Sequence, residues 1–329
     1  MLSRVANSIY WMSRYVERAD NVARFIDVNL NLILDADIGL EQQWQPLVNT
    51  SGDHELFAEH YGMADEENVV RFLAFDHRNP NSILSCLKAA RENARTIREI
   101  ISSPMWEQLN EFYLYVKDVA QNPNAIESLS RFFDQIHRGT NTHAGLTSST
   151  LTHDEPWHFS HLGRMLERAD KISRILDVKY FILLRSPDDV GTAFDDIQWS
   201  AVLQSASAFE MYRKRYGRIT PKGIVEFLLL NREFPRAARF CLDKANDSLH
   251  AISGSSPGQV VNQAEKRLGQ LCSEVTFTSV EEIIDGGLHE YLDRLQTQLN
   301  QVGESIFTTF FAVKTPVQGN QGQRPQAQE

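Results

Sequence analysis

The chain contains one charged segment twice, with the pattern R-x-x-E-R-A-D-x-x-x-R-x-x-D-V at residues 14–28 and 164–178. Eight of the fifteen positions are identical at a spacing of 150 residues, where chance supplies about one. Further along, the spacing becomes 155 and the order of matches is kept, at Trp44/Trp199, Tyr61-Gly62/Tyr216-Gly217, Phe72-Leu73/Phe227-Leu228, Pro80/Pro235, Cys86-Leu87/Cys241-Leu242 and Ala90/Ala245. We therefore predict a tandem duplication, with a first helical repeat at 1–150 and a second at 151–313 that together form one compact unit.

Each repeat is expected to be built from helices. Only 17 glycines and 11 prolines occur in 329 residues, and no alternating strand pattern bounded by turns is present. The fold class we predict is all-α, a multi-helix bundle of two pseudo-symmetric, tandemly duplicated halves. Pro104 and Pro257 are each expected near the start of a helix, where the missing N–H is harmless. We expect long helices at 2–36, 81–102, 125–148, 156–185, 236–252 and 279–312, shorter apolar ones at 66–75 and 221–230, and a disordered tail at 314–329, which is rich in Gln, Pro and Gly.

Composition excludes several classes of protein. The net charge of −10 and the absence of a basic patch argue against nucleic-acid binding. No run of eighteen apolar residues predicts a membrane span, and the first residues lack the pattern of a signal peptide. The three cysteines, Cys86, Cys241 and Cys272, form no C-x-x-C motif, which is typical of inert thiols in a reducing compartment. A cytoplasmic protein without a membrane anchor is the expectation.

The repeated segment places its charges beside the core. At about 100° per residue, one face of the first helix is apolar, formed by Val5, Ile9, Met12, Val16, Ala19, Ala23, Ile26, Leu30 and Ile33. The acids and Arg24 border this face instead of lying opposite it. We predict a ligand-binding site or a buried charge network from both copies: Arg14, Glu17, Arg18, Asp20, Arg24 and Asp27, with Arg164, Glu167, Arg168, Asp170, Arg174 and Asp177. A solvated ladder of ion pairs, worth about 0.2–0.5 kcal/mol per pair, remains the alternative.

Three further groups are weaker candidates. The spacing Glu17-x-x-Asp20 lacks the histidine of a di-iron bundle and has arginines beside it, so we expect no metal and no cofactor. The histidine-rich segment 153–161 is best explained as a helix start capped by Asp154. In the polar stretch that follows Phe75, Asn79 or Asn81 is expected to cap the N-terminus of the next helix. Arg91, Arg95 and Arg98 lie on one helical face and form a secondary candidate site for an anion.

The sequence contains no phosphate-binding loop, nucleophile elbow or zinc-protease motif. It does resemble a known family over nearly its whole length, the bacterial alpha-E proteins, named for a predicted α-helical domain with a Glu-Arg motif. The Glu-Arg pairs would be those at 17–18 and 167–168. The strings that carry the resemblance are LSRVANSIYWMSRYVERADNVAR at 2–24, FDHRNPNSILSCLKAARENAR at 75–95, MWE at 105–107, GRMLERAD at 163–170 and FLLL at 227–230.

The resemblance implies a partner and a pathway, but no catalytic residues. Members of the family are typically encoded beside, or fused to, a circularly permuted ATP-grasp ligase, often near a transglutaminase-like protein. It therefore implies a non-ATP-binding accessory or interaction protein in a peptide- or amide-forming pathway. Two alternatives stay open: an enzyme of amide or peptide modification that uses a Glu/Arg cleft around Glu17 and Glu167, and a purely structural helical homo-oligomer. The residues favour a binding protein over an enzyme without deciding between them.

Overall fold

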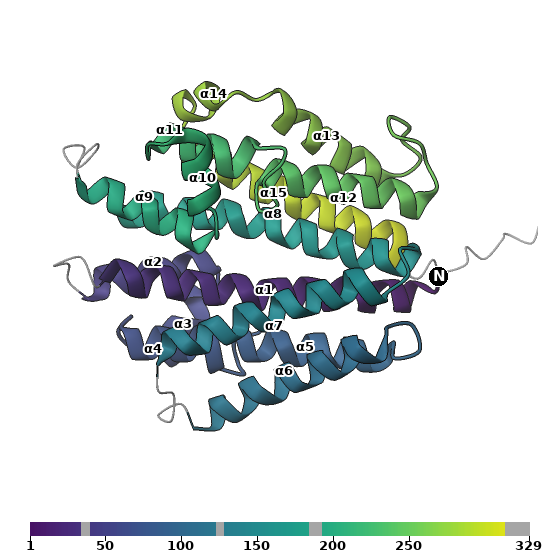
Figure 1. Cartoon of the computed structure of the whole chain (residues 1–329), viewed down its shortest axis with the longest axis horizontal. Coiled ribbons are helices and arrows are strands. Elements are labelled where there is room, and N and C mark those ends of the chain that lie inside the picture. The colour runs from purple at the N-terminus through teal and green to yellow at the C-terminus, as the bar shows by residue number, and fades with distance from the viewer. Residues whose placement is uncertain (34–39, 123–127, 184–192, 313–329) are drawn as a thin grey trace, which may run out of the picture.

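The computed structural model describes residues 1–33, 40–122, 128–183 and 193–312. Within these ranges every regular element is a helix, so the protein belongs to the all-α class (Figure 1). No helix in the described part of the chain is both long and apolar enough to cross a bilayer. The tail predicted to be disordered, 314–329, lies outside the described residues, as does the start of the helix expected from residue 125.

Two long helices, α1 (Ser3–Ile33) and α8 (Glu155–Leu183), lie side by side through the middle of the molecule (Figure 1). They run in the same direction, because contacts along their length join residues at a nearly constant separation. The amino group of Met1 contacts Glu155, 154 residues away, the hydroxyl of Ser13 contacts Ser160, 147 residues away, and Arg14 contacts Glu167, 153 residues away. Residues of the two copies of the charged segment therefore meet across one helix–helix interface.

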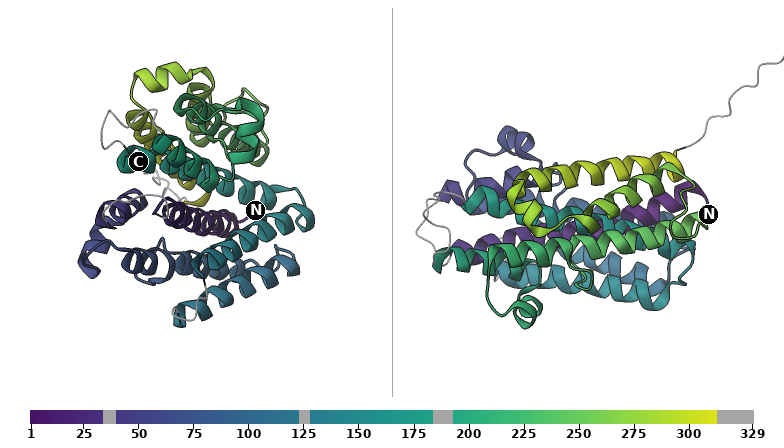
Figure 2. Two further views of the ribbon diagram at one scale, coloured as in Figure 1. Left: turned by 60° about the vertical axis from the view of Figure 1, so that its left-hand side comes forward. Right: turned by 90° about the horizontal axis from the view of Figure 1, so that it is seen from above.

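Three helices cover each side of this central pair. On one side lie α5 (Ile83–Thr96), α6 (Ser103–Gln121) and α7 (Leu129–Thr150), of which α5 and α7 contact α1. On the other side lie α12 (Ala238–Ser253), α13 (Gln263–Phe277) and α15 (Leu288–Ile306), of which α12 and α15 contact α8. Figure 2 shows α15 running along the length of the molecule.

Shorter helices close one end of the bundle. The first set is α2 (Leu40–Ser51), α3 (His54–His60) and α4 (Glu66–Val70), and the second is α9 (Ala193–Ser205), α10 (Phe209–Tyr216) and α11 (Pro221–Val225). Each set also reaches across to the other central helix, because α2 contacts α8 and α9 contacts α1. These contacts cover further surface of α1 and α8, the two helices that carry the charged segments.

The predicted apolar helices at 66–75 and 221–230 are present, but each finishes in a wider π-helical turn. These turns are η1 (Arg71–Phe75) and η4 (Glu226–Leu230), and a third, η5 (Phe307–Phe311), follows α15. Each of the first two turns ends at a side chain that caps the next loop: a carboxylate oxygen of Asp76 accepts the Arg78 backbone N–H, and the amide oxygen of Asn231 accepts that of Glu233. Chain direction thus changes abruptly before Pro80 and Pro235.

Several predicted boundaries were wrong for local reasons. The expected helix 279–312 is broken into α14 (Val280–Asp285), α15 and η5, because Gly286-Gly287 interrupts it and Gly287 has a φ of 91°. Pro257 lies in a loop rather than at a helix start, since α12 ends at Ser253 and Asn262 caps α13. The cap of α5 is Ser82, whose hydroxyl accepts the backbone N–H of Ser85, so neither Asn79 nor Asn81 has that role.

The apolar faces merge into one core. Trp44 from α2 and Phe72 from η1 are fully buried in it, together with Ile9 and Ile26 of α1. Cys86 and Cys241 are buried free thiols, and burial raises the pKa of each to about 12. Such thiols stay protonated at neutral pH and act as small apolar groups, which agrees with the sequence prediction.

Candidate functional site

Glu167 of α8 lies in a pocket of cations provided mainly by α1. Its side chain is completely buried, and the Nε of Arg14 donates to one of its oxygens at 2.8 Å. Arg18 holds both oxygens, from Nε at 2.7 Å and from Nη2 at 3.1 Å. The ammonium of Lys171 is 3.7 Å from Oε1. Burying a carboxylate is costly unless it is paired, and here one carboxylate has three cationic neighbours.

Glu17 of α1 has the reciprocal arrangement. Its side chain is 1% exposed, and Arg168 of α8 binds it in a two-pronged manner, with Nε at 2.7 Å and Nη2 at 2.8 Å. The second cation is Arg236, from the loop before α12, whose Nη1 is 3.3 Å away. Each Glu-Arg pair is therefore exchanged: the arginine of one central helix binds the glutamate of the other.

The same network continues along α1 to Asp20, which is also fully buried. Arg24 Nε donates to it at 2.8 Å, Arg236 Nη2 at 2.9 Å, and the Nδ1 of His137 from α7 lies 2.7 Å from its other oxygen. Arg24 in turn donates to the backbone carbonyl of Ser205, beyond the central pair. Asp20 therefore joins α1, α7 and the loop before α12 through charge-assisted hydrogen bonds, and Arg24 extends these contacts to α9.

The remaining acids of the two segments are less enclosed. Asp170 is bound by Lys171 at 3.0 Å and by Arg174 Nε at 3.0 Å. Asp177 lies 2.7 Å from the Nδ1 of His289. Burial raises the pKa of Asp27, which stands at the edge of the network near His137. Of the twelve predicted site residues, the structure brings nine into ion pairs around Glu17, Glu167, Asp20 and Asp170. Of the other three, Asp177 is paired with His289, Asp27 stands at the edge near His137, and Arg164 lies apart.

Pairing decides the protonation of the buried acids. Burial alone would raise the pKa of Glu17, but Arg168 and Arg236 lower it below its usual range. For Glu167 the same burial is outweighed by Arg18, Arg14 and Lys171, and its pKa lies well below the usual range. Glu17 and Glu167 are thus buried and paired, and a solvated ladder of ion pairs does not describe these two carboxylates.

Arg164 behaves differently from every other arginine of the two segments. It has no hydrogen-bond or ion-pair partner among the described residues, and its Nε is covered without an acceptor. Burial lowers the pKa of its guanidinium to about 10, and the nearby charge of Arg168 contributes to the decrease. An arginine at the corresponding position in the first segment, Arg14, is fully engaged with Glu167.

A cavity of about 520 Å³ lies directly beside the network, at Arg14. Its wall combines the charged residues Arg14, Arg18, Asp170 and Glu304 with aromatic side chains from α1 and η5. The full lining is Tyr10, Trp11, Arg14, Arg18, Leu166, Asp170, Leu299, Asn300, Gly303, Glu304, Phe307 and Phe311. The Arg14 guanidinium lies 4.8 Å from the ring of Trp11 and donates through Nη1 to the Tyr10 hydroxyl at 3.2 Å.

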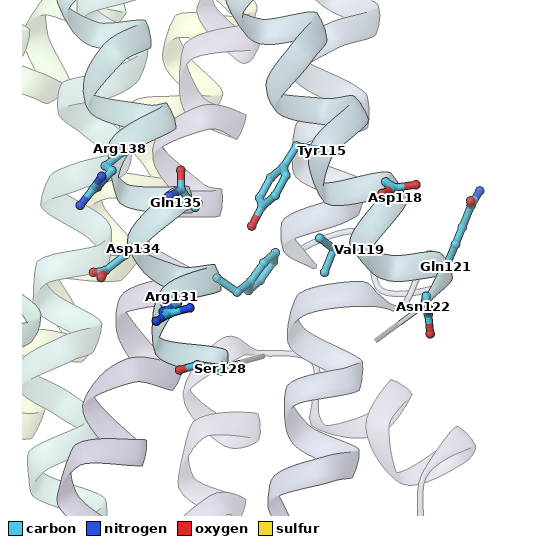
Figure 3. Close-up of a pocket in the computed structure, with 11 residues that line it drawn as sticks. Tyr115, Asp118, Val119, Gln121, Asn122, Ser128, Arg131, Asp134, Gln135 and Arg138 are labelled. Atoms are coloured by element: carbon cyan, nitrogen blue, oxygen red, sulfur yellow. The ribbon is translucent and has the colours of Figure 1, made fainter. Parts of the chain in front are cut away.

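A second cavity, of about 780 Å³, opens between the end of α6 and the start of α7 (Figure 3). Tyr115 of α6 points into it in Figure 3, and its ring stacks on Phe132 of α7 with centroids 6.2 Å apart. Asp118, Asp134 and Arg138 also line it. None of the residues predicted to form the site is among its lining.

A family model for a predicted alpha-helical domain with a conserved ER motif, Alpha-E, matches residues 1–311. The chain belongs to the Alpha-E family. Uncharacterized proteins of Mycobacterium bovis and Mycobacterium tuberculosis are 22% identical to this Alpha-E chain in an alignment of 340 positions that covers 94% of the chain. That match covers only 37% of each mycobacterial protein. No solved structure matches the chain.

The secondary candidate site of this Alpha-E protein is already occupied in part by its own side chains. Arg91 donates to Glu92 at 2.8 Å and to Asn110 at 2.7 Å, and Arg95 also binds Glu92. The guanidinium of Arg98 lies 4.9 Å from the ring of Trp106. The three arginines share an exposed face, but an anion would compete there with Glu92.

The histidine-rich segment forms a column of rings at the start of α8. His153 stacks on Trp157 with centroids 4.2 Å apart, and Trp157 stacks on His161 at 4.6 Å. The expected side-chain cap by Asp154 is not among the hydrogen bonds of the described residues, although the Asp154 carbonyl accepts the His158 N–H. No group of three or more metal-ligating side chains occurs in the described parts of the chain.

Sequence reasoning missed the residues that come to the network from elsewhere in the chain. Arg236 joins Glu17 to Asp20, and His137 binds Asp20 from α7. Asn81 accepts from Arg18 Nη1 at 2.8 Å. One signal was present: at the spacing of 155, Asn81 corresponds to Arg236, and both follow a proline.

Proposed function

We propose that this Alpha-E protein is a non-ATP-binding accessory protein that acts with a circularly permuted ATP-grasp ligase in a peptide- or amide-forming pathway. In this proposal the cavity beside Arg14 holds a segment of the ligase's substrate or product. The observation that carries it is a contrast between two neighbouring places. The carboxylates of Glu17 and Glu167 are enclosed and neutralised by arginines. The adjoining cavity of about 520 Å³ combines the cation of Arg14, the amide of Asn300 and aromatic walls.

The buried acids are poorly suited to catalysis. A general acid or base needs a pKa near the working pH and contact with the reacting group. Glu17 and Glu167 have lowered pKa values and are 1% and 0% exposed, with guanidinium groups on their oxygens. This arrangement supports a binding role for the site and weighs against the alternative enzyme that would use these glutamates.

The cavity has the features that a peptide group requires. The Nε and Nη1 of Arg14 are used by Glu167 and Tyr10, which leaves Nη2 as the donor for an incoming carboxylate or amide oxygen. The side chain of Asn300 supplies both a donor and an acceptor, and Phe307 and Trp11 offer apolar surface. These groups match a short peptide or an acylated amine better than a nucleotide, for which no phosphate-binding loop is available.

The central network supports the proposed duplication as well. We propose that residues 1–150 and 151–313 are equivalent repeats, joined where α7 ends and α8 begins. The exchanged pairs Arg18–Glu167 and Arg168–Glu17, and the π-helical turns that end at Phe75 and Leu230, supply equivalent parts from each repeat. The charged strip would then brace the junction, and the cavity at its edge would be available for a ligand.

The mycobacterial relatives bear on the partner. The matched segment is 37% of each of those proteins, so in them a module similar to this chain is joined to a much longer polypeptide. A module that functions beside other domains is consistent with a docking role. The transglutaminase-like protein is the second partner that the family resemblance implies, as an enzyme able to cleave or exchange the product.

The direct test is association with the ligase. The full chain should co-purify with a circularly permuted ATP-grasp ligase from the same organism, and should raise the rate at which that ligase consumes ATP with its peptide substrate. No association together with no effect on the ligase would sink the proposal. A stable dimer that ignores the ligase would favour the alternative of a structural homo-oligomer.

The cavity can be blocked with a matched control. A Cβ added at Gly303 would meet only the Arg14 Nη1, at 3.8 Å, so Gly303→Phe should fold and fill the cavity. Gly145 is also a helical glycine with open space around it, and Gly145→Phe tests the cost of the substitution alone. We expect Gly303→Phe to lose the effect on the ligase at an unchanged Tm, and Gly145→Phe to keep it.

A further inference from the structure

Arg14 and Arg164 stand at equivalent positions, 150 residues apart, yet only one of them has a counterion. Arg14 is bound to Glu167 at 2.8 Å and to the Tyr10 hydroxyl at 3.2 Å. The residue that corresponds to Tyr10 is Ser160, and its hydroxyl is already tied to Ser13 at 2.7 Å. Arg164 therefore lacks the two groups that hold its counterpart.

The glutamate that could neutralise Arg164 is already taken. By analogy with Arg14 and Glu167, the partner of Arg164 would be Glu17. Both oxygens of Glu17 are occupied by Arg168, and Arg236 adds a third donor at 3.3 Å. In the first half the position of Arg236 is held by the neutral Asn81, so Glu167 has room for Arg14.

The surroundings of Arg164 are short of negative charge. Arg168 lies one turn further along the same helix, and the buried side chain of His143 from α7 has an Nε2 without a partner. Burial lowers the pKa of His143 to about 4 and that of His161 to about 3, and in both cases the charge of Arg164 contributes. Both imidazoles are therefore neutral at pH 7, so neither adds a positive charge beside Arg164.

Two observations together point to a ligand. An unpaired guanidinium inside a protein is costly, and pairing with an anion removes that cost. Arg164 is not sealed off: part of its side chain remains accessible to solvent, so a small ion can reach it. Arginine is also the side chain best suited to a planar or tetrahedral oxyanion, because its donors are arranged as a fork.

We propose that Arg164 is the centre of a binding site for a small oxyanion, a carboxylate or a phosphate, on α8 beside His143 of α7. The site is separate from the cavity at Arg14 and does not depend on the proposed function. The ion serves as the counterion of Arg164, as Glu167 does for Arg14, because Glu17 is already bound to Arg168 and Arg236.

The experiment uses the full chain in a phosphate-free zwitterionic buffer at constant ionic strength. Inorganic phosphate and acetate are titrated separately, and binding is followed by calorimetry and by the shift in Tm, which rises with ligand concentration when only the folded state binds. The concentrations of phosphate and acetate are kept in the millimolar range, because phosphate at high concentration stabilises proteins without binding to a specific site. The probe that binds more tightly shows whether the site prefers a phosphate or a carboxylate.

The variants are Arg164→Gln and, as a matched control, Arg213→Gln on an exposed face of α10. We expect the wild type and Arg213→Gln to bind one anion, and Arg164→Gln to lose at least tenfold in affinity. Arg164→Lys keeps the charge but not the fork and should bind more weakly than the wild type. Absence of binding to the wild type, or equal affinity in Arg164→Gln, overturns the proposal, and a water molecule then satisfies Arg164.

A second measurement does not depend on whether Arg164→Gln folds. An anion at Arg164 reduces the positive potential at His143, so the ring of His143 should titrate at a higher pH when phosphate is bound. The imidazole resonance, assigned with His143→Gln, should shift with phosphate and stay unchanged with sodium chloride at the same ionic strength. An unchanged titration in saturating phosphate would count against the site even if bulk binding were observed.

Discussion

The two ends of the central network, one at Glu167 and the other at Glu17, differ although the same segment builds both. At Glu167 the counterions are Arg14, Arg18 and Lys171. At Glu17 they are Arg168 and Arg236, while Arg164 stays outside. The difference arises at positions where the two copies differ: Asn81 in the first half corresponds to Arg236 in the second, Asn21 to Lys171 and Tyr10 to Ser160. Two segments that share eight of fifteen residues therefore pair every arginine in one copy and leave Arg164 without a counterion among the described residues in the other.

The largest effect should come from removing either buried carboxylate. Glu167→Gln leaves Arg14 and Arg18 without their counterion, and Glu17→Gln does the same to Arg168 and Arg236. We expect each change to lower the free energy of unfolding by about 3–5 kcal/mol, measured by urea denaturation.

An exposed glutamate provides the control for this measurement. Glu281 forms an ion pair with Lys222 in which both side chains are largely exposed, so Glu281→Gln should leave the free energy of unfolding nearly unchanged. Losses of the same small size for Glu167→Gln and Glu17→Gln would mean that the central network behaves like a surface ladder.

Acid should destabilise the protein in two steps. The folded pKa values of His143, about 4, and His161, about 3, lie below the ordinary 6.5, so the unfolded chain binds more protons and stability falls as the pH drops below about 6.5. The lowered pKa values of Glu17, Glu167 and Asp170, the last at about 2, add a steeper loss below about 4.5.

The two steps can be separated by measuring unfolding from pH 7.5 to pH 3. His143→Gln should reduce the first step and leave the second in place. Arg164→Gln should also reduce the first step, because it removes a positive charge that disfavours protonation of both histidines. A profile that stays flat down to pH 4.5 would contradict the assignment of the histidines.

The equivalent arginines should respond to the same substitution with opposite signs. Arg14→Gln removes one cation from buried Glu167 and should destabilise by about 1–3 kcal/mol. Arg164→Gln removes a charge that has no partner in the described part of the chain, and should leave stability in anion-free buffer unchanged or raise it by up to about 1 kcal/mol. Equal losses for both variants would show that Arg164 is paired after all.

The smallest effect expected is a coupling between Arg236 and Arg164. Arg236→Asn gives the second half the residue found in the first and frees one side of Glu17. If Arg164 then moves to Glu17, a double-mutant cycle of Arg236→Asn with Arg164→Gln should give a coupling energy of at least about 0.5 kcal/mol. A coupling near zero would indicate that Arg164 cannot reach Glu17.

Helical periodicity was enough to predict the all-α class, and the long central helices were placed within a few residues, because amphipathic patterns and prolines mark such segments well. The breaks were harder. Gly286-Gly287 lies inside a continuous apolar pattern, and the pattern alone does not show that Gly287 adopts a positive φ. The helical spacing of about 100° per residue also placed the charged side chains beside the apolar face, and their burial follows from that position.

The partners of the charges could not be predicted from the helix that carries them. Arg236 and His137 are more than 100 residues from Asp20 along the chain, and only tertiary folding brings them to it. The exchange of the Glu-Arg pairs is likewise invisible in a single segment, since neighbouring Glu17 and Arg18 project to different partners. Arg164 is left without a counterion because Glu17 pairs with Arg168 and Arg236 instead.

The exchanged pairs also impose an order on biosynthesis. Arg14 and Arg18 leave the ribosome early, but their carboxylate follows about 150 residues later, with Glu167. Until then the nascent first half holds cations at its future interface with nothing to neutralise them, and Glu17 waits for Arg168 in the same way. The first half is therefore not expected to complete its fold during synthesis, and premature termination after α7 would produce a chain that chaperones and proteases can recognise.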